Sequence, residues 1–542
     1  MLRLETLAFW PMRLTLLLLS TAALALCQGP SATCGPVTTD KGAVSGSPAG
    51  SGCVFKGIPY AQPPIGALRF RPAVPHDPWS GVLATTAQGN RCPQLDANNN
   101  VVGAEDCLFL NLWAPGQLSG GLPVMVWFHG GGHVAGTNAF ANGGLTPFDG
   151  QYFVERFGVV VVTVEYRLNV LGYLALPALD AESPQGVSGN YGFLDEVAAL
   201  QWVQQNIAAF GGDPARVTLF GMSAGGEDVE NHVASPLSNG LFSAAIMESP
   251  AVSFDAVPTL VRLEQTTGAQ VVKAVGCADE ADVAACLRAL PLAKLIPAVP
   301  GISSTIAQGN YGPVVDGYVL PAPPLDMIAV GTHNHVPVMI GTNADETYLN
   351  ITPSSIPDEA TYRAVLRGTF GNAGGDLVLA QYPAADYPSP ERAFVTATTD
   401  NTFTCQVRTV VRTLANSQNA PVFRYLLTHT WGSGTPQSQR QSYHGIELLF
   451  VWHNFAALTG YTPSESELAL ADSVTGYWAR FATYGDPNGF NAVYWPAALN
   501  WYDDIFLQLD DSISAGRGVR ASNCEFWDKH PELSIYRGSK RD

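Results

Sequence analysis

The sequence predicts an α/β fold built on a large, twisted and mostly parallel sheet with helices on both faces. Its 542 residues are 46% hydrophobic and 14% charged, which is typical of a well-packed globular protein. Several short apolar runs each lead into a polar or glycine-rich turn, as buried strands do. A helical pattern separates two of these runs, and strands that alternate with helices favour a parallel sheet.

The predicted strands lie at residues 122–128, 159–166, 217–221, 335–341 and 422–427. Between the second and third of them, one face of a predicted helix carries Val197, Leu200, Val203, Ile207 and Phe210. The Gly-Gly-Asp-Pro segment that follows ends this helix. In such folds the chemistry gathers at the C-terminal ends of the strands, which is where the polar motifs of this chain fall.

The N-terminal segment is typical of an export signal. Arg13 precedes the apolar residues 14–27, which are too few to span a bilayer, and residues 23–25 form a small-x-small cleavage site. We therefore expect a signal peptide over residues 1–27, a single domain over residues 28–542, and a secreted or periplasmic protein.

The cysteines fit an exported protein, in which disulfides persist. Cys27 offers an alternative as a lipid anchor, but the bulky Leu26 before it disfavours lipidation. The remaining cysteines are even in number, as full pairing requires: Cys34, Cys53, Cys92, Cys107, Cys277, Cys286, Cys405 and Cys524. No CxxC pair occurs and the histidines do not cluster with cysteines, so we expect no zinc site. The chemistry described below is expected to need no metal and no cofactor.

The formal net charge of −18 limits the possible partners. It disfavours nucleic acids and anionic membrane surfaces. We also expect no transmembrane segment in the mature chain. The motifs described below point instead to a small-molecule substrate.

The segment Gly221-Met222-Ser223-Ala224-Gly225 is a G-x-S-x-G pattern. A predicted strand precedes it and a predicted helix follows, and this tight turn lifts a serine hydroxyl out of the sheet. Such a serine becomes a nucleophile only when a base removes its proton and an acid orients that base. The alternative, an idle serine in a glycine-rich turn, is disfavoured by the partners described next.

Candidate partners of Ser223 follow later strands in the order that this fold type uses, acid and then histidine. The acid is Asp345 or Glu346, which both come after the strand at residues 335–341. The base is His444, because the other histidines precede the acids or fall in less suitable segments. A solvent-facing or structural role is the alternative for this histidine.

Residues 129–133, His-Gly-Gly-Gly-His, follow the first predicted strand and offer unhindered backbone N–H groups. An oxyanion needs such donors, each worth on the order of 3 kcal/mol, and Ala224 adds another N–H. The three glycines are otherwise explained as a flexible loop.

With these pieces in place, the chain resembles the type B carboxylesterases, the family of cholinesterases, carboxylesterases and related lipases. The likeness covers nearly all of the mature sequence and includes FKGIPYAQPPIGALRF, EDCLFLNLWAP, YGPVVDG, HGIELLFV and the terminal CEFWD. It implies an α/β-hydrolase fold with helical insertions around a gorge. It also implies a serine carboxylesterase that forms an acyl-enzyme on Ser223.

The resemblance assigns individual residues as well. It selects Glu346 over Asp345 as the acid and places the oxyanion donors at Gly131, Gly132 and Ala224. The disulfides that it implies are Cys92–Cys107, Cys277–Cys286 and Cys405–Cys524, which leaves Cys34 to pair with Cys53.

Two departures from the family bear on the substrate. The loop between Cys92 and Cys107 is short and contains no aromatic residue, whereas cholinesterases hold a quaternary ammonium there by cation–π attraction. Met222 stands where the family has a glutamate, which removes a negative charge beside the nucleophile. Choline esters are therefore not expected to be favoured substrates.

The helix after the nucleophile is unusually acidic. Glu227, Glu230 and Asn231 share a face with Ser223 at helical spacing, whereas Asp228 points about 100° away from Glu227. One interpretation is a structural polar network, since buried carboxylates need partners. The other is that one acid replaces the missing glutamate as electrostatic support for His444.

The sequence thus predicts a secreted serine carboxylesterase. The alternatives are a lipase or bulky-ester esterase of the same family, and a non-catalytic adhesion or binding member of the fold. Adhesion members typically lose residues of the catalytic set, whereas this chain keeps a serine, an acid, a histidine and the glycines.

Overall fold

The computed structural model describes residues 34–116, 120–138, 148–250, 257–307, 309–432, 436–458 and 460–535. The predicted signal peptide at residues 1–27, including Cys27, lies outside these residues. Within the described residues, none of the helices combines the length and the apolar character needed to cross a membrane.

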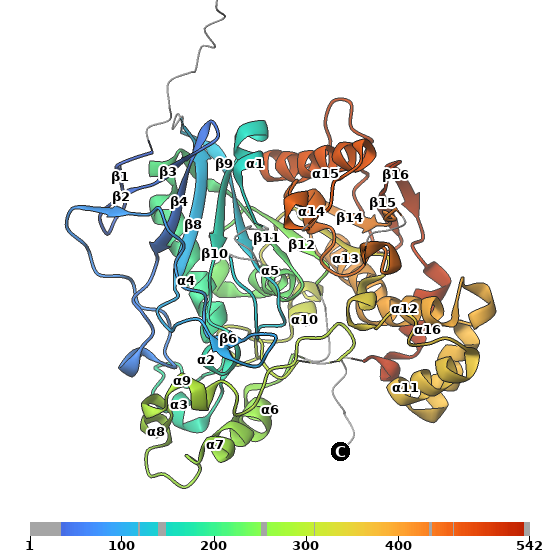
Figure 1. Ribbon diagram of the computed structural model, residues 1–542, viewed down its shortest axis with the longest axis horizontal. Helices are drawn as coiled ribbons and strands as arrows, with labels where there is room; N and C mark the ends of the chain where they lie inside the picture. Colours follow the sequence, from blue (N-terminus) through green and yellow to red (C-terminus); the bar gives the residue numbers. More distant parts are fainter. Residues whose placement is uncertain are drawn as a thin grey trace, which may run out of the picture. The chain divides into compact units, whose positions relative to one another are not determined.

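The described residues form a sheet of eleven strands with the order β16-β15-β14-β13-β12-β11-β9-β10-β8-β4-β3 (Figure 1). The strands are β3 (Ser47–Ala49), β4 (Gly52–Pro59), β8 (Phe109–Pro115), β9 (Leu122–Phe128), β10 (Val160–Val164), β11 (Gly212–Met222), β12 (Ala244–Glu248), β13 (Val338–Asn343), β14 (Val422–Leu427), β15 (Ile505–Leu509) and β16 (Ser514–Arg517). The pairings from β10 to β15 are all parallel, and antiparallel pairs close both edges.

The mostly parallel sheet agrees with the sequence prediction. The five predicted strands are β9, β10, β11, β13 and β14, all in the parallel centre. The structure adds β12 between β11 and β13, a five-residue strand that is not among the predicted ones. Because the centre is parallel, the polar segments after β9, β11, β13 and β14 meet at one edge of the sheet.

Helices cover both faces of the sheet. One face packs against α4 (Tyr191–Asn206), α5 (Ala224–Ala234) and α13 (Cys405–Ser417). The other packs against α1 (Gln151–Phe157), α14 (Leu448–Val451) and α15 (Glu465–Tyr484). Strand β9 shows the alternation, since Val124 and Val126 face the first layer whereas Met125 and Trp127 face the second.

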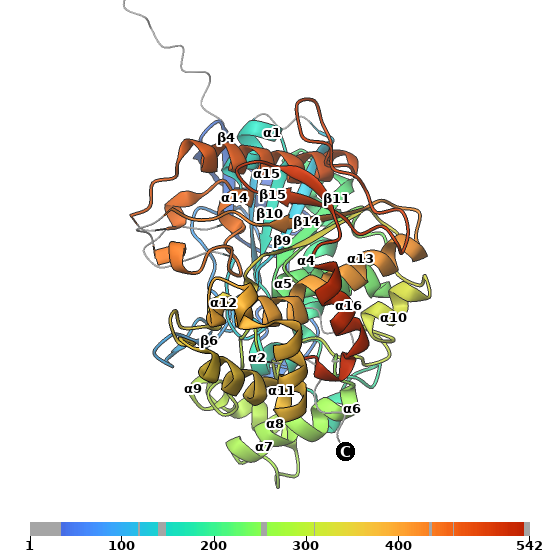
Figure 2. The ribbon, with the colours of Figure 1, turned by 90° about the vertical axis from the view of Figure 1, so that its right-hand side faces the viewer.

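Helical insertions gather at the lower end of the sheet in both views (Figures 1 and 2). They comprise α6 (Leu260–Leu263), α7 (Ala269–Val275), α8 (Val283–Ala289), α9 (Leu292–Leu295), α11 (Glu359–Gln381) and α12 (Pro390–Thr399). Four shorter or peripheral helices are α2 (Asn169–Tyr173), α3 (Pro177–Asp180), α10 (Pro324–Ala329) and α16 (Ala521–Lys529).

Four disulfides secure the loops and insertions. They are the three pairs that the resemblance implies, Cys92–Cys107, Cys277–Cys286 and Cys405–Cys524, and the pair left by elimination, Cys34–Cys53. The longest closure, Cys405–Cys524, spans 119 residues and ties the start of α13 to α16. Cross-links of this length stabilise mainly by restricting the unfolded chain, by about 4 to 5 kcal/mol in the chain-entropy model.

Candidate active site

Ser223 occupies the sharp turn between β11 and α5. Its backbone is left-handed, with φ +59° and ψ −124°, and its N–H donates to the carbonyl of Glu248 at 2.9 Å. The glycines on either side are needed for close approach. A Cβ on Gly221 would lie 2.3 Å from the carbonyl oxygen of Gly225, and one on Gly225 would lie 2.1 Å from that of Phe128. The G-x-S-x-G pattern is therefore a steric requirement of this turn.

His444 and Glu346 form a hydrogen-bonded pair in the loops after β14 and β13. Nδ1 of His444 lies 2.7 Å from Oε2 of Glu346, and the glutamate is fully buried. The other carboxylate oxygen of Glu346 accepts the N–H of Asn343 at 2.6 Å. Asp345 turns away and pairs with Arg392 at 2.5 Å. Of the two candidate acids, Glu346 is therefore the one that reaches His444.

The surroundings of His444 favour the imidazolium. Burial alone lowers the pKa of His444, but the charge and hydrogen bond of Glu346 raise it, and the carboxyls of Glu447 and Glu227 add to the increase. The net result is a pKa of His444 above its ordinary value. The ring of Phe403 packs against the imidazole with centroids 5.1 Å apart.

The glycine segment after β9 is held in place at both ends. At its start, the ring of His129 stacks on Tyr166, whose hydroxyl donates to the His129 carbonyl at 2.6 Å. At its end, the side chain of Gln94 forms a pair of hydrogen bonds with the backbone of Gly136, of 2.7 and 2.9 Å. Gln94 belongs to the Cys92–Cys107 loop, so this disulfide loop supports the segment.

Gly131 and Gly132 both adopt positive φ, +123° and +64°. A Cβ on Gly131 would lie 2.0 Å from the carbonyl oxygen of Ala135, so a side chain is excluded there. This conformation is accessible to glycine at little cost and leaves the backbone N–H groups unobstructed.

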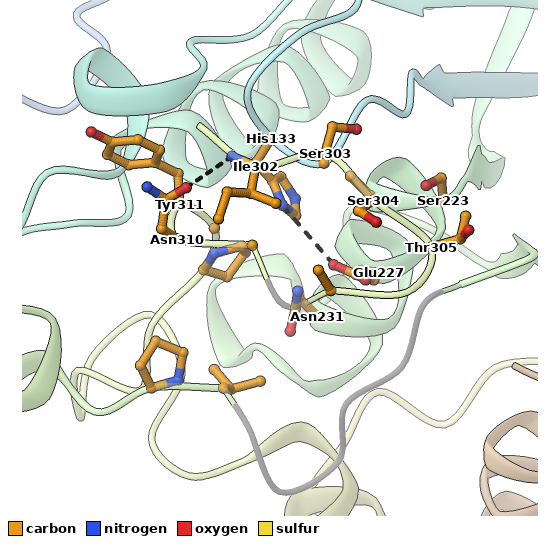
Figure 3. Close-up of a pocket in the computed structure, with 18 of the residues that line it drawn as sticks. His133, Ser223, Glu227, Asn231, Ile302, Ser303, Ser304, Thr305, Asn310 and Tyr311 are labelled. Carbon is orange, nitrogen blue, oxygen red and sulfur yellow. Dashed lines mark hydrogen bonds and ion pairs between the residues drawn. The ribbon is translucent and has the colours of Figure 1, made fainter. Parts of the chain in front are cut away.

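A cavity of about 350 Å³ brings these elements together. Its wall includes Ser223, Ala224, Gly132 and His444, while Gly131 is the residue before Gly132 in the same loop. The cavity therefore places the serine, the histidine and two of the three predicted donor residues around one space. Figure 3 shows part of its lining, with Ser223 near the loop of Ser303, Ser304 and Thr305.

The helix acids divide as their spacing predicted. Glu227, Glu230 and Asn231 line the cavity together with Ser223. Asp228 is fully buried on another side of α5, and its two oxygens lie 2.9 and 3.0 Å from Nε2 of His133.

Three residues in or beside the site were not singled out from the sequence: His133, Glu447 and Phe403. His133 ends the glycine motif, so its place in HGGGH was the available signal. Glu447 lies three residues after His444 and contributes to its raised pKa. Phe403 precedes α13 and gave no sequence signal, because its contact depends on how the insertion packs.

The fold and the site together define an α/β-hydrolase. The chain belongs to the Carboxylesterase family, whose profile matches residues 34–527. It is 36% identical over 476 residues to the fumonisin B1 esterase of Sphingopyxis macrogoltabida, covering 84% of this chain and 83% of that protein. It is 35% identical over 508 residues to the pyrethroid hydrolase Ces2e of Rattus norvegicus, covering 88% and 85%.

Solved structures agree with these relatives. A structure of PNB esterase superposes with a TM-score of 0.76 at 32% identity, covering 90% of this chain and 99% of that one. The protein is thus a carboxylic ester hydrolase of the serine esterase class. The predicted family and fold class are confirmed.

Proposed function

We propose that the protein hydrolyses carboxylic esters through an acyl-enzyme, with Ser223 as nucleophile, His444 as general base and acid, and Glu346 as the residue that orients the histidine. The observation that carries this proposal is the 2.7 Å hydrogen bond between His444 and Glu346, beside a cavity that His444 shares with Ser223. Glu346 accepts from Nδ1, which leaves Nε2 available for the serine proton.

In the acylation step the Ser223 oxygen attacks the ester carbonyl while His444 takes its proton. The carbonyl oxygen becomes an oxyanion, which the N–H groups of Gly131, Gly132 and Ala224 stabilise. When the intermediate collapses, the bond to the alcohol breaks and the His444 proton passes to the departing alkoxide. In deacylation, water loses a proton to His444 and attacks the acyl-enzyme, and Ser223 regains its proton as the acid leaves.

Residues 28–542 then form one catalytic domain, which the signal peptide at residues 1–27 directs out of the cytoplasm. The four disulfides support this part of the proposal, because structural disulfides persist mainly in oxidising compartments. Cleavage is testable by N-terminal sequencing of the exported protein, which is expected to begin between residues 26 and 28. Recovery of protein that retains its original N-terminus outside the cytoplasm would contradict the signal peptide.

The roles are tested by turnover of a chromogenic acetate ester. Ser223→Ala and His444→Ala are each expected to lower kcat by at least ~10³-fold while the protein stays folded, because members of such a set act as a unit. Glu346→Gln is expected to cost less, since nucleophile and base remain. Asp345→Asn is the matched control and is expected to cost clearly less than Glu346→Gln. Wild-type turnover in Ser223→Ala would overturn the nucleophile, and the reverse order of the acid variants would exchange the two acids.

A further inference from the structure

The cavity wall beyond Ser223 is acidic, and helix α5 makes it so. Glu227 and Glu230 stand four and seven residues after Ser223, on the helix face that continues from the serine into the cavity. With a rise of 1.5 Å per residue, they lie roughly 6 and 10 Å along the helix axis from Ser223. Apolar side chains such as Leu263 and Leu349 line other parts of the same cavity.

Glu230 lacks the partner that a buried carboxyl normally has. The residue is 4% exposed, and among the described residues nothing hydrogen-bonds to its buried Oε1. Buried polar groups are usually paired, so an unpaired carboxyl oxygen in a residue that lines the cavity points to a donor that a ligand supplies. Glu227 keeps 28% of its side chain exposed and forms an ion pair with His133, whose Nδ1 lies 4.0 Å from Oε2 of the glutamate (Figure 3).

The two carboxyls hold their protons unusually well. Burial raises the pKa of Glu230 to about 8, and the neighbouring Glu227 adds to the increase. Burial also raises the pKa of Glu227 to about 8, against the attraction of His133. The charges of His133, Asp228 and His444 also act on Glu227, and Arg262 and Tyr311 are the other titratable residues that line the described part of the cavity. An ammonium cation binds the ionised form of Glu227 and Glu230, so its binding displaces their protons. The affinity for the cation therefore rises with pH until both carboxyls are ionised.

We propose that this wall is a specificity site for esters that carry a primary or secondary ammonium group, with Glu230 and Glu227 accepting its N–H donors. The inference rests on the esterase function proposed above and names the substrate class for the same cavity. The ammonium group lies beyond the scissile carbonyl along α5, while the carbonyl stays at Ser223.

A donor cation fits this wall better than a quaternary one. Carboxylate oxygens accept charge-assisted hydrogen bonds from N–H groups. A quaternary ammonium has no N–H to donate and is held best over an aromatic face. Glu230 and Glu227 are therefore expected to bind an ammonium group with N–H donors more tightly than a quaternary ammonium of the same charge. The test below uses this difference.

The test compares three ethyl esters at about pH 8.5: ethyl ω-aminohexanoate, its N-trimethylated analogue, and ethyl heptanoate, the neutral isostere. Hydrolysis is followed by ethanol release. The ammonium ester is expected to exceed ethyl heptanoate in kcat/KM by at least ~10-fold, mainly through KM, as one charge-assisted hydrogen bond provides. The trimethylated ester is expected to gain no such advantage. At about pH 6.5, where the carboxyls are protonated, the ratio of ammonium to neutral ester is expected to fall.

Variants locate the effect. Glu230→Gln removes the charge at constant size and is expected to lower the ammonium-to-neutral ratio roughly tenfold. Asn231→Asp adds a carboxylate to the same wall and is expected to raise the ratio. Glu280→Gln, on an exposed loop away from the cavity, is the matched control and should leave the ratio unchanged.

Hydrolysis of ethyl heptanoate distinguishes a failure of the esterase function from a failure of the ammonium site. An enzyme that hydrolyses neither ester contradicts the proposed function itself. An enzyme that hydrolyses ethyl heptanoate but shows no ammonium preference, or prefers the trimethylated ester equally, overturns only the specificity site. An unchanged ratio in a folded Glu230→Gln protein also overturns it. If that variant does not fold, the wild-type comparison and Asn231→Asp decide.

Discussion

Removing Asp228 tests how the acidic helix is stabilised. Asp228 and His133 are 95 residues apart in sequence, yet the aspartate oxygens lie 2.9 and 3.0 Å from Nε2 of the histidine. Both side chains are buried, with exposures of 0% and 3%. Asp228→Ala leaves His133 buried beside the glycine loop without its partner.

The magnitude follows from this burial. Removing one member of a buried ion pair costs about 3 to 5 kcal/mol. Asp228 also interacts with the buried Glu196, whose pKa burial raises well above its ordinary value and whose charge interaction and hydrogen bond with Asp228 raise it further, so Asp228→Ala removes a second contact. We take the lower end of the range, about 3 kcal/mol, as the minimum cost. With an unfolding entropy of about 2.1 cal/mol/K per residue over roughly 500 residues, this cost lowers Tm by about 3 °C.

The pH dependence has a definite sign. Burial alone lowers the pKa of His133, but the charge and hydrogen bond of Asp228, with Glu227, raise it above its ordinary value. The ion pair therefore contributes its full stabilisation of the folded state below the pKa of His133 in the unfolded chain, about 6.5. This stabilisation is lost as the pH rises through the pKa of His133 in the folded protein. The Tm difference between wild type and Asp228→Ala is therefore expected to be largest near about pH 6.

Differential scanning calorimetry at about pH 6 and about pH 9 measures both effects. Asp279→Ala, at an exposed position, is the control and is expected to change Tm little. An Asp228→Ala protein with wild-type Tm at both pH values would refute the structural role of the pair. So would a Tm difference that grows with pH.

Three further predictions concern the chemistry. Glu227→Gln is expected to move the acidic limb of the kcat/KM–pH profile to lower pH, because the Glu227 anion raises the pKa of His444. The shift is expected to be less than about one pH unit, since Glu227 is largely protonated at the pH of that limb. An unmoved limb would mean that Glu227 does not stabilise the imidazolium of His444. Met222→Glu is expected to raise kcat only when Glu227 is neutralised as well, a coupling that a double-mutant cycle measures, and simple additivity would contradict it. A short neutral acyl ester is expected to be hydrolysed with a higher kcat/KM than the choline ester of the same acid, and faster than emulsified long-chain triglycerides, in initial-rate assays. A choline ester with the higher kcat/KM would contradict the inference drawn from the Cys92–Cys107 loop.

The parallel sheet was predictable because its strands are continuous apolar runs, which few other structures require. Strand β12 (Ala244–Glu248) was not predicted from the sequence, because it is short and its alanines have little preference for the β conformation. The position of Ser223 was predictable from its glycines, since a Cβ at either one would clash with backbone.

The side-chain partners were harder to predict than the strands. The choice of Glu346 over Asp345 needed the resemblance, because adjacent residues in a loop differ only in the direction of their side chains. The pairing of His133 with Asp228 joins the loop after β9 to helix α5, 95 residues further along the chain, so no local pattern encodes it. The cavity walls come from insertions whose packing depends on long-range contacts, and the sequence offered no way to place Phe403 against His444.

The central claim is that Ser223 is the nucleophile and that His444 activates it, and covalent labelling tests it most directly. Wild-type protein is treated with a fluorophosphonate, and peptide mass spectrometry then locates the adduct while residual esterase activity is measured. We expect one adduct per chain, on Ser223, with activity falling in proportion to labelling, and a much slower reaction in His444→Ala. A stoichiometric adduct on another residue that abolishes activity, or full labelling of Ser223 with activity intact, would contradict the claim.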